Sequence, residues 1–249
     1  MWAVFLTVRF MAITTVMFDL DGTLLPMNQD YFIETYFETV VNFVSTERRY
    51  DKKELYFAMW AGIKEIMNNN FGARPNDQVF WEQMANRLGE RILSDKDCFE
   101  KYYATKYQEL QRICGFNQHA SRTVKMVRQA GANCVLATNP FFPQTAIDAR
   151  LSWAGVELDD FIHVTTYDKS SFCKPDPDYY REILSVIGAK PEECIMVGND
   201  ASDDLAAEQA GIKTFILTDC LINTGKVDLT CVPCGSFIQL QQFLAEQLK

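Results

Sequence analysis

The chain has 249 residues, of which 48% are hydrophobic and 13% aromatic, and its formal net charge is −9. This length and apolar content predict a globular protein with one large domain, or a core with a smaller insert. The acidic balance argues against nonspecific nucleic-acid binding, because such binding depends on Lys and Arg side chains that neutralise phosphates. Binding of a small phosphate ester is compatible with the acidic net charge, because a bound metal ion can make the electrostatic potential inside one pocket positive.

Eight cysteines are scattered along the chain, mostly in apolar stretches, which predicts reduced thiols and a cytoplasmic protein. Cys231 and Cys234 form one Cys-x-x-Cys without a second pair or a nearby histidine, so we expect no zinc or redox role there.

The first ten residues are apolar but shorter than the roughly 20 residues that span a bilayer, and they lack a leading basic segment. We therefore expect no membrane partner.

The first predicted strand is residues 14–18, a run of β-branched and apolar side chains that ends at Asp19. Residues 28–114 follow with aromatic and charged side chains at helical spacing and without a clear strand run. We interpret this stretch as a separate helical unit inserted after the first strand.

Beyond the insert, apolar runs of strand length alternate with helical segments that each stop at a glycine. The predicted helices are 119–130, 143–154, 177–187 and 203–210, and the predicted strands are 134–137, 162–166, 194–197 and 214–217. This alternation predicts an α/β fold with a doubly wound, Rossmann-like parallel sheet. Residues 1–27 and 115–249 would form the core, and residues 28–114 a helical cap.

Polar side chains follow several of the predicted strands at the point where each strand ends. Asp19 and Asp21 follow the first strand, and two carboxylates so close to an apolar strand are costly unless a positive group joins them. Gly22 allows a sharp turn away from the strand. Taken alone, this segment is equally well explained as a solvated polar turn.

Three other strand ends carry side chains of complementary chemistry. Thr138 and Asn139 follow the second strand, Lys174 lies in the loop after the third, and the acidic loop 198–204 follows the fourth. Ligands of open parallel sheets bind beyond the carboxyl ends of the strands, so these groups should meet at one edge. Singly, each has an ordinary structural explanation: a solvated lysine, a hydroxyl that caps backbone, or Asp203 as the N-cap of the next helix.

The set and order of these motifs resemble the haloacid dehalogenase superfamily, whose members are mostly phosphatases. Residues 19–23, Asp-Leu-Asp-Gly-Thr, resemble the first motif, Thr138 the second, Lys174 the third and the loop after Gly198 the fourth. The resemblance covers about residues 13–217. The insert resembles the helical cap of the phosphoglycolate phosphatase-like and β-phosphoglucomutase-like branch.

The fourth motif departs from the family pattern, which has Asp directly after the glycine. Asn199 holds that position here, and Asp200 comes next. Either Asn199 binds the metal through its neutral amide oxygen, or Asp200 is the metal ligand instead. We favour Asp200, because Mg²⁺ prefers hard, usually anionic oxygen ligands.

The resemblance implies a Mg²⁺-dependent hydrolysis of a small phosphate monoester through an aspartyl-phosphate intermediate. Asp19 would be the nucleophile and Asp21 the acid and base. Thr138, Asn139 and Lys174 would bind the phosphoryl group. The metal ligands would be the Asp19 carboxylate, the Asp21 backbone carbonyl, and Asn199 or Asp200.

Alternatives of the same fold stay open. A dehalogenase would not need Asp21, because a halide leaves without a proton. A phosphomutase would keep the same core, and a noncatalytic phosphate-binding protein would tolerate Asn199. The sequence names no substrate, although Tyr31, Tyr36 and Arg74 are possible cap contacts for a small phosphorylated metabolite.

Overall fold

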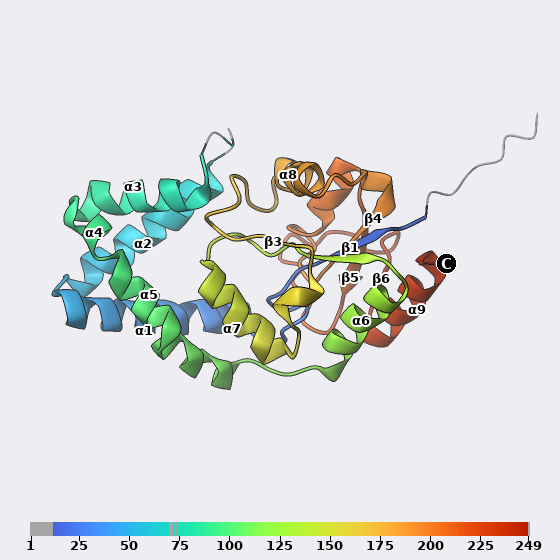
Figure 1. Cartoon of the computed structure of the whole chain (residues 1–249), viewed down its shortest axis with the longest axis horizontal. Helices are drawn as coiled ribbons and strands as arrows, with labels where there is room; N and C mark the ends of the chain where they lie inside the picture. Colours follow the sequence, from blue (N-terminus) through green and yellow to red (C-terminus); the bar gives the residue numbers. More distant parts are fainter. Residues whose placement is uncertain (1–11, 70–71, 73, 249) are drawn as a thin grey trace, which may run out of the picture.

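A computed structural model of the protein describes residues 12–69, 72 and 74–248. Its centre is a six-stranded sheet in which every neighbouring pair is parallel, with strand order β3-β2-β1-β4-β5-β6. Helices cover both faces, and a helical unit extends from one end (Figure 1). The predicted α/β fold with a helical insert is therefore confirmed. The strands are β1 (Thr15–Phe18), β2 (Asn133–Leu136), β3 (His163–Val164), β4 (Cys194–Gly198), β5 (Lys213–Leu217) and β6 (Cys234–Gly235).

Two strands differ from the expectation. The run 162–166 forms only the two-residue strand β3, although the backbone N–H groups of Ile162 and Thr165 donate to the β2 carbonyls of Cys134 and Leu136. Strand β6 was not predicted, because Cys234 and Gly235 form no apolar run. It completes the sheet beside β5.

Side-chain caps fix the starts of several helices. The Asn28 and Asp51 side chains cap the first two helices by accepting backbone N–H bonds, and Asp176 caps α8 in the same way. The helices are α1 (Gln29–Arg48), α2 (Lys52–Met67), α3 (Asn76–Leu88), α4 (Arg91–Ser94), α5 (Lys96–Ala104), α6 (Gln118–Gln129), α7 (Gln144–Ala154), α8 (Pro177–Ile187) and α9 (Phe237–Gln247).

Four short 3₁₀ helices complete the described elements: η1 (Lys106–Ile113), η2 (Leu158–Asp160), η3 (Pro191–Glu193) and η4 (Leu205–Ala210). The last of these replaces the predicted helix 203–210. It starts later because residues 200–204 form a hydrogen-bonded loop before it.

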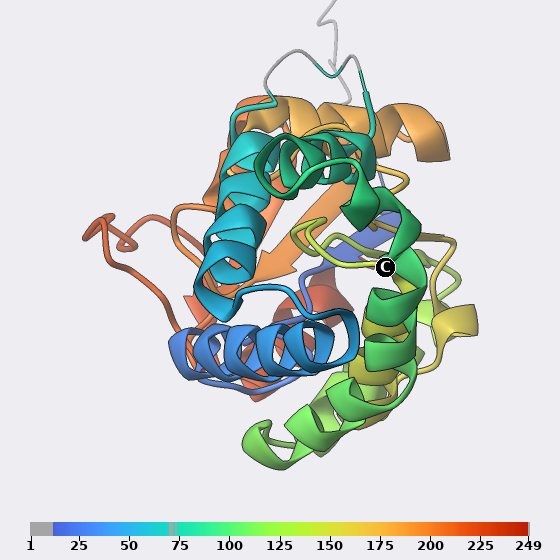
Figure 2. The same cartoon turned by 90° about the vertical axis from the view of Figure 1, so that its left-hand side faces the viewer.

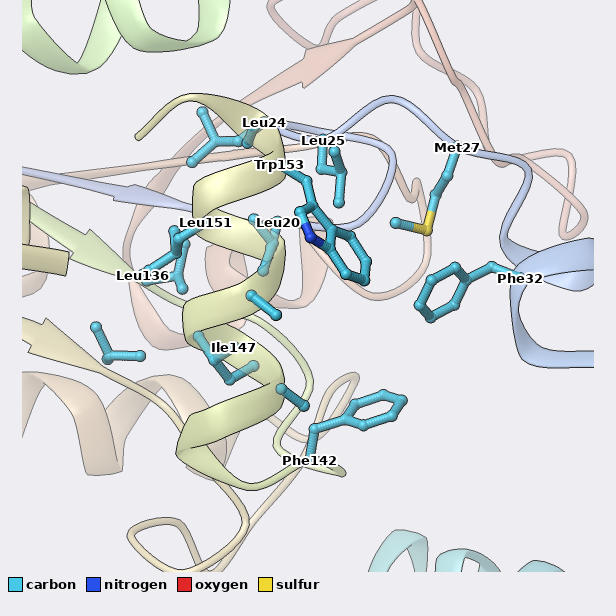
Figure 3. Packing of buried hydrophobic residues seen from close by; sticks show 14 of the residues in the cluster. Leu20, Leu24, Leu25, Met27, Phe32, Leu136, Phe142, Ile147, Leu151 and Trp153 are labelled. Atoms are coloured by element: carbon cyan, nitrogen blue, oxygen red, sulfur yellow. The ribbon is translucent and has the colours of Figure 1, made fainter. Parts of the chain in front are cut away.

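The sheet separates two apolar clusters, as expected when successive side chains of a strand point to opposite faces. Val16 and Phe18 of β1 belong to the cluster that includes residues of α6, α7 and α9, whereas Met17 belongs to the cluster of α8 and η4. Figure 3 shows α7 with its buried neighbours, including Leu151 close to Leu136 of β2. Helix α7 is thereby held against the strands that end at the site.

The insert contains α1 to α5 and η1, and it faces the viewer in Figure 2. An antiparallel bridge joins Met27 to Cys114, and the Gly115 N–H donates to the Pro26 carbonyl at 2.6 Å. We propose, from this pairing of the two connecting segments, that the cap spans 28–114. Of the predicted core, residues 1–11 and 249 lie outside the described residues.

Within the described ranges, no helix combines the length and hydropathy needed to cross a membrane. The eight cysteines are all free thiols, and the Cys231–Cys234 pair forms no disulfide.

Candidate active site

The four predicted strand ends meet at one cavity of about 280 Å³. Asp19 directly follows β1, Asn199 follows β4, and Thr138 lies two residues beyond β2. Every predicted site residue lines this cavity: Asp19, Asp21, Thr138, Asn139, Lys174, Asn199 and Asp200. Side chains that are far apart in the sequence are brought together because parallel strands end at the same edge of the sheet.

Lys174 links two of the loops through buried ion pairs. Its Nζ donates to Asp19 Oδ1 at 2.9 Å and to Asp204 Oδ1 at 2.7 Å. Burial by itself would lower the pKa of Lys174, but the carboxylates of Asp19 and Asp204 raise that pKa well above its usual value. The ammonium is therefore a fixed positive charge beside Asp19.

Asp19 is buried and lines the cavity. Burial raises the pKa of its carboxyl to about 7, and the charge of Lys174 opposes that rise. Its Oδ2 accepts no hydrogen bond from the described residues, whereas Oδ1 is held by Lys174. One oxygen is thus oriented and the other is available to a ligand.

Asp21 forms an ion pair with Arg150, a residue that the sequence analysis did not single out. Arg150 is fully buried on α7, its Nε donates to the Ala146 carbonyl, and its guanidinium lies 4.3 Å from the centroid of the Phe142 ring. Burial raises the pKa of the Asp21 carboxyl, and the charges of Arg150 and Lys174 oppose the rise. Arg150 therefore orients the carboxyl that was predicted to be the acid and base.

A sequence signal for Arg150 did exist. Ala146, Ile147, Leu151 and Ala154 mark the buried face of α7 by helical spacing, and position 150 lies within that face. A charged side chain there needs a buried partner.

We expect Arg150→Met to lower the free energy of unfolding by about 3 kcal/mol, because breaking a buried ion pair leaves one charge without its partner. This loss lies at the lower end of the range for broken buried ion pairs, because the Asp21 side chain is 21% exposed and water can still solvate its charge. Urea unfolding measures it. Arg150→Lys, which retains the charge, is the matched control, and the Asp21→Asn/Arg150→Met pair should be less destabilised than the sum of the single variants. A change below about 0.5 kcal/mol for Arg150→Met would contradict a structural role for the pair.

Thr138 and Asn139 form the part of the site beyond β2. The Thr138 carbonyl accepts bonds from the Thr165 and Tyr179 hydroxyls, which fixes the backbone beneath its own side chain. The Asn139 amide donates to Asp203 Oδ2 at 2.9 Å and accepts from the Lys174 N–H at 3.0 Å. Asn139 thereby connects three of the loops.

The loop after β4 gives each acidic residue a separate position. Asp200 Oδ1 accepts the N–H groups of Ser202 and Asp203, while Asp204 Oδ2 accepts the Asp200 N–H at 2.9 Å. The suggestion that Asp203 caps the following helix is wrong: η4 begins after Asp204, and the Asp203 carboxylate bonds Asn139 instead. Burial raises the pKa of Asp203 to about 6.

Asn199 is buried, and both ends of its amide have protein partners. Its Oδ1 accepts from the Thr23 hydroxyl at 2.9 Å, and its Nδ2 donates to the Cys220 carbonyl at 2.8 Å. Two glycines make room for this loop. A Cβ at Gly22, whose φ is +83°, would lie 2.4 Å from Asn199 Nδ2, and one at Gly198 would lie 1.9 Å from Asp204 Oδ2.

Hard oxygen donors of the kind that Mg²⁺ prefers surround the cavity. They are the free Asp19 Oδ2, the Asp21 carbonyl, Asn199 Oδ1 and the Asp200 carboxylate. Gln29, another residue that the sequence analysis missed, donates its Nε2 to the Asp21 carbonyl at 2.5 Å, which leaves one lone pair of that oxygen. The residues therefore fit a divalent cation. In the described part of the chain, no three His, Cys, Asp or Glu side chains are grouped to hold a metal, so the Asp21 carbonyl and an amide oxygen would have to complete a ligand set that contains only the Asp19 and Asp200 carboxylates.

Of the three suggested cap contacts, only Tyr36 lies at a cavity wall. Tyr31 is exposed, and Arg74 forms a surface ion pair with Glu82.

A protein-family model described as haloacid dehalogenase-like hydrolase matches residues 13–211. The pyrophosphatase PpaX of Anoxybacillus flavithermus is 28% identical over 205 residues, which cover 82% of this chain and 83% of that protein. PpaX of Bacillus cereus strain AH820 is 26% identical, with 82% of each chain covered.

Solved structures share the fold at lower identity. The 2-haloacid dehalogenase of Pseudomonas syringae pv. Tomato DC3000 has a TM-score of 0.64 at 18% identity, covering 94% of this chain and 99% of that one. A HAD phosphatase of Thermococcus onnurineus has a TM-score of 0.57 at 19% identity, covering 95% and 100%.

Proposed function

Because the chain belongs to the haloacid dehalogenase-like hydrolase family, we propose that it is a Mg²⁺-dependent phosphatase that hydrolyses a small phosphate monoester. The observation that carries the proposal is the arrangement of Asp19, Asp21 and Lys174 around one cavity. A carboxylate with one free oxygen, a second carboxyl two residues on and a buried ammonium are the groups that phosphoryl transfer needs.

In the proposed reaction, Asp19 Oδ2 attacks phosphorus and forms an aspartyl phosphate. Asp21 gives a proton to the leaving oxygen, and the same carboxylate then takes a proton from the water that hydrolyses the intermediate. Arg150 holds the Asp21 side chain in place throughout. A bound Mg²⁺ would offset the repulsion between the Asp19 carboxylate and the phosphoryl oxygens.

Thr138 and Lys174 bind the phosphoryl group in this proposal. The Lys174 ammonium already lies against Asp19, so it can neutralise charge there without reorganisation. Thr138 contributes its hydroxyl and Asn139 positions the Lys174 backbone. Asp204 keeps the ammonium in place through its 2.7 Å contact.

The test is phosphate release from a panel of phosphate monoesters with and without Mg²⁺, compared with Asp19→Asn. Pyrophosphate, an anhydride rather than an ester, is tested beside this panel because the relatives named above are pyrophosphatases. Transfer of phosphate between two sugar positions without release would favour a phosphomutase. Binding of phosphate without turnover of any ester would favour a noncatalytic protein.

We propose Asp200 as the anionic ligand of the fourth loop, with Asn199 as the alternative. Asp200→Ala should therefore raise the Mg²⁺ concentration for half-maximal activity more than Asn199→Ala does, because only the first removes a negative charge from the cation. Calorimetric titration with Mg²⁺ provides the second measurement.

Two further variants make this comparison sharper. If Asn199 is the ligand, the order reverses and Asn199→Asp tightens Mg²⁺ binding. Asp203→Ala should have a smaller effect, since its carboxylate bonds Asn139. An unchanged Mg²⁺ dependence in all of these variants would exclude this loop from the metal site.

A further inference from the structure

A second and larger cavity adjoins the catalytic one on the side of the cap. Its volume is about 640 Å³, which falls within the range of small-molecule pockets. Four residues line both cavities: Ile33, Met67, Phe141 and Phe142. A molecule whose phosphate lies at Asp19 can therefore extend past these side chains into the second cavity.

The walls of this cap cavity are mainly apolar, and ten of the residues that line it are aromatic. Most of these aromatic residues come from the cap helices, which face the viewer in Figure 2. The Trp60 ring of α2 stacks on Phe37 of α1, with centroids 4.5 Å apart. Trp81 of α3 meets the Phe99 ring of α5 edge to face at 5.1 Å. Such walls favour an apolar, preferably aromatic, occupant, because ring faces and edges supply large contact areas.

Two of the hydroxyl groups of the cap cavity offer little to a polar ligand. Tyr36 and Tyr103 both line it, but their hydroxyls bond each other at 2.6 Å. Burial raises the pKa of both phenols above the usual value, so they are neutral. Tyr36 and Tyr103 therefore present mainly apolar surface, because their two hydroxyls already satisfy each other.

The charged groups of the cap cavity are predominantly acidic. Among the described residues, the carboxyls of Asp77, Glu100 and Asp168 line it together with one ammonium, that of Lys96. Lys96 Nζ lies 4.8 Å from the centroid of the Trp81 ring, so part of its charge is already matched by an aromatic face. A second anionic group on the substrate would meet net repulsion here.

We propose that the cap cavity holds the leaving group and selects phosphate monoesters of bulky, uncharged, aromatic or otherwise apolar alcohols, against small or anionic leaving groups. This inference rests on the proposed phosphatase function. In the reaction, the bond from phosphorus to the alcohol oxygen breaks as the bond to Asp19 forms, and the alcohol departs with the proton from Asp21. Water then releases phosphate, so that ester and water become alcohol and phosphate.

The first experiment compares 2-naphthylmethyl phosphate with methyl phosphate, whose leaving alcohols have similar acidity, and with phosphoglycolate and pyrophosphate. We expect kcat/KM for the naphthylmethyl ester to exceed kcat/KM for each of the other three substrates by at least about tenfold. A gain of this size is typical when additional apolar groups of a substrate fill an apolar pocket. Calorimetry with the nonhydrolysable naphthylmethyl- and methylphosphonates should show the same preference in Kd.

Two matched pairs of variants locate the effect. Ala104→Trp places a large ring at the cavity wall and should remove most of the naphthylmethyl preference, while Ala130→Trp, at an exposed position outside both cavities, should not. Glu100→Lys should raise kcat/KM for phosphoglycolate relative to methyl phosphate by about fivefold at low salt. Glu90→Lys makes the same charge change away from the cavity and should leave that ratio unaltered.

The outcomes separate this inference from the phosphatase proposal. Tighter binding of naphthylmethylphosphonate that Ala104→Trp removes, without hydrolysis of any ester, would support the cap cavity and refute the phosphatase function. Asp19-dependent hydrolysis with equal kcat/KM for methyl and naphthylmethyl esters would overturn the cap cavity alone. Equal Kd values for the two phosphonates would also overturn it.

Discussion

Asp19→Asn is expected to lower kcat by more than about 10⁴-fold, because an amide cannot form the acyl phosphate and the second step then has no substrate. Its Oδ1 can still accept from Lys174, so the fold should persist, which circular dichroism and thermal unfolding would check. Acid-quenched wild-type protein should also carry phosphate on the peptide that contains Asp19, and the variant should carry none.

Asp95→Asn provides a matched control for this result. Asp95 is also buried and paired, with Arg48 and Arg91, but it lines neither cavity. The same carboxylate-to-amide change there should affect stability rather than turnover. Retention by Asp19→Asn of more than a few per cent of wild-type kcat would refute the assignment of the nucleophile.

Asp21→Asn should slow the cleavage of alkyl phosphates by about 10² to 10⁴-fold, the usual contribution of a positioned proton donor. Aryl phosphates with acidic leaving groups need less protonation and should lose much less at the phosphorylation step. Single-turnover kinetics with one alkyl and one nitrophenyl ester measure the two losses separately.

The control for Asp21 separates proton transfer from general damage. Asp203 also lines the catalytic cavity, but its carboxylate bonds Asn139, so Asp203→Asn should change both ester classes by a similar factor. The neutral amide in Asp21→Asn would leave the Arg150 charge unpaired, and the stability of the variant must be measured alongside. Equal losses for alkyl and aryl esters in Asp21→Asn would remove the proton-donor role.

Much of the core followed from local sequence patterns. Runs such as Val16 to Phe18 are apolar without interruption because both faces of a parallel sheet are covered, and this pattern is local. The positions of Asp19, Thr138 and Asn199 at strand ends follow from the same runs. Their meeting in one cavity required only that parallel strands end at one edge.

Elements with weak local signals were missed or misplaced. Strand β6 has two residues and gains its place by hydrogen bonding to β5 rather than by its composition. The helix predicted at 203–210 shortened to a 3₁₀ turn because hydrogen bonds within residues 200–204 form a loop before it. In both places, contacts between neighbouring segments outweighed the local preference.

The sequence by itself determined the α/β core and the helical insert, and it placed the candidate site residues Asp19, Asp21, Thr138 and Lys174 at or just beyond strand ends, because strand periodicity is a property of neighbouring residues. Only the tertiary structure decided that Arg150, 129 positions from Asp21, holds that carboxyl, and that Gln29 contacts its carbonyl. It also brought aromatic side chains of α1, α2, α3 and α5 around one cavity. Such contacts depend on how helices pack against each other. Residue spacing along the chain does not specify which pairs of side chains, distant in the sequence, come into contact in the fold.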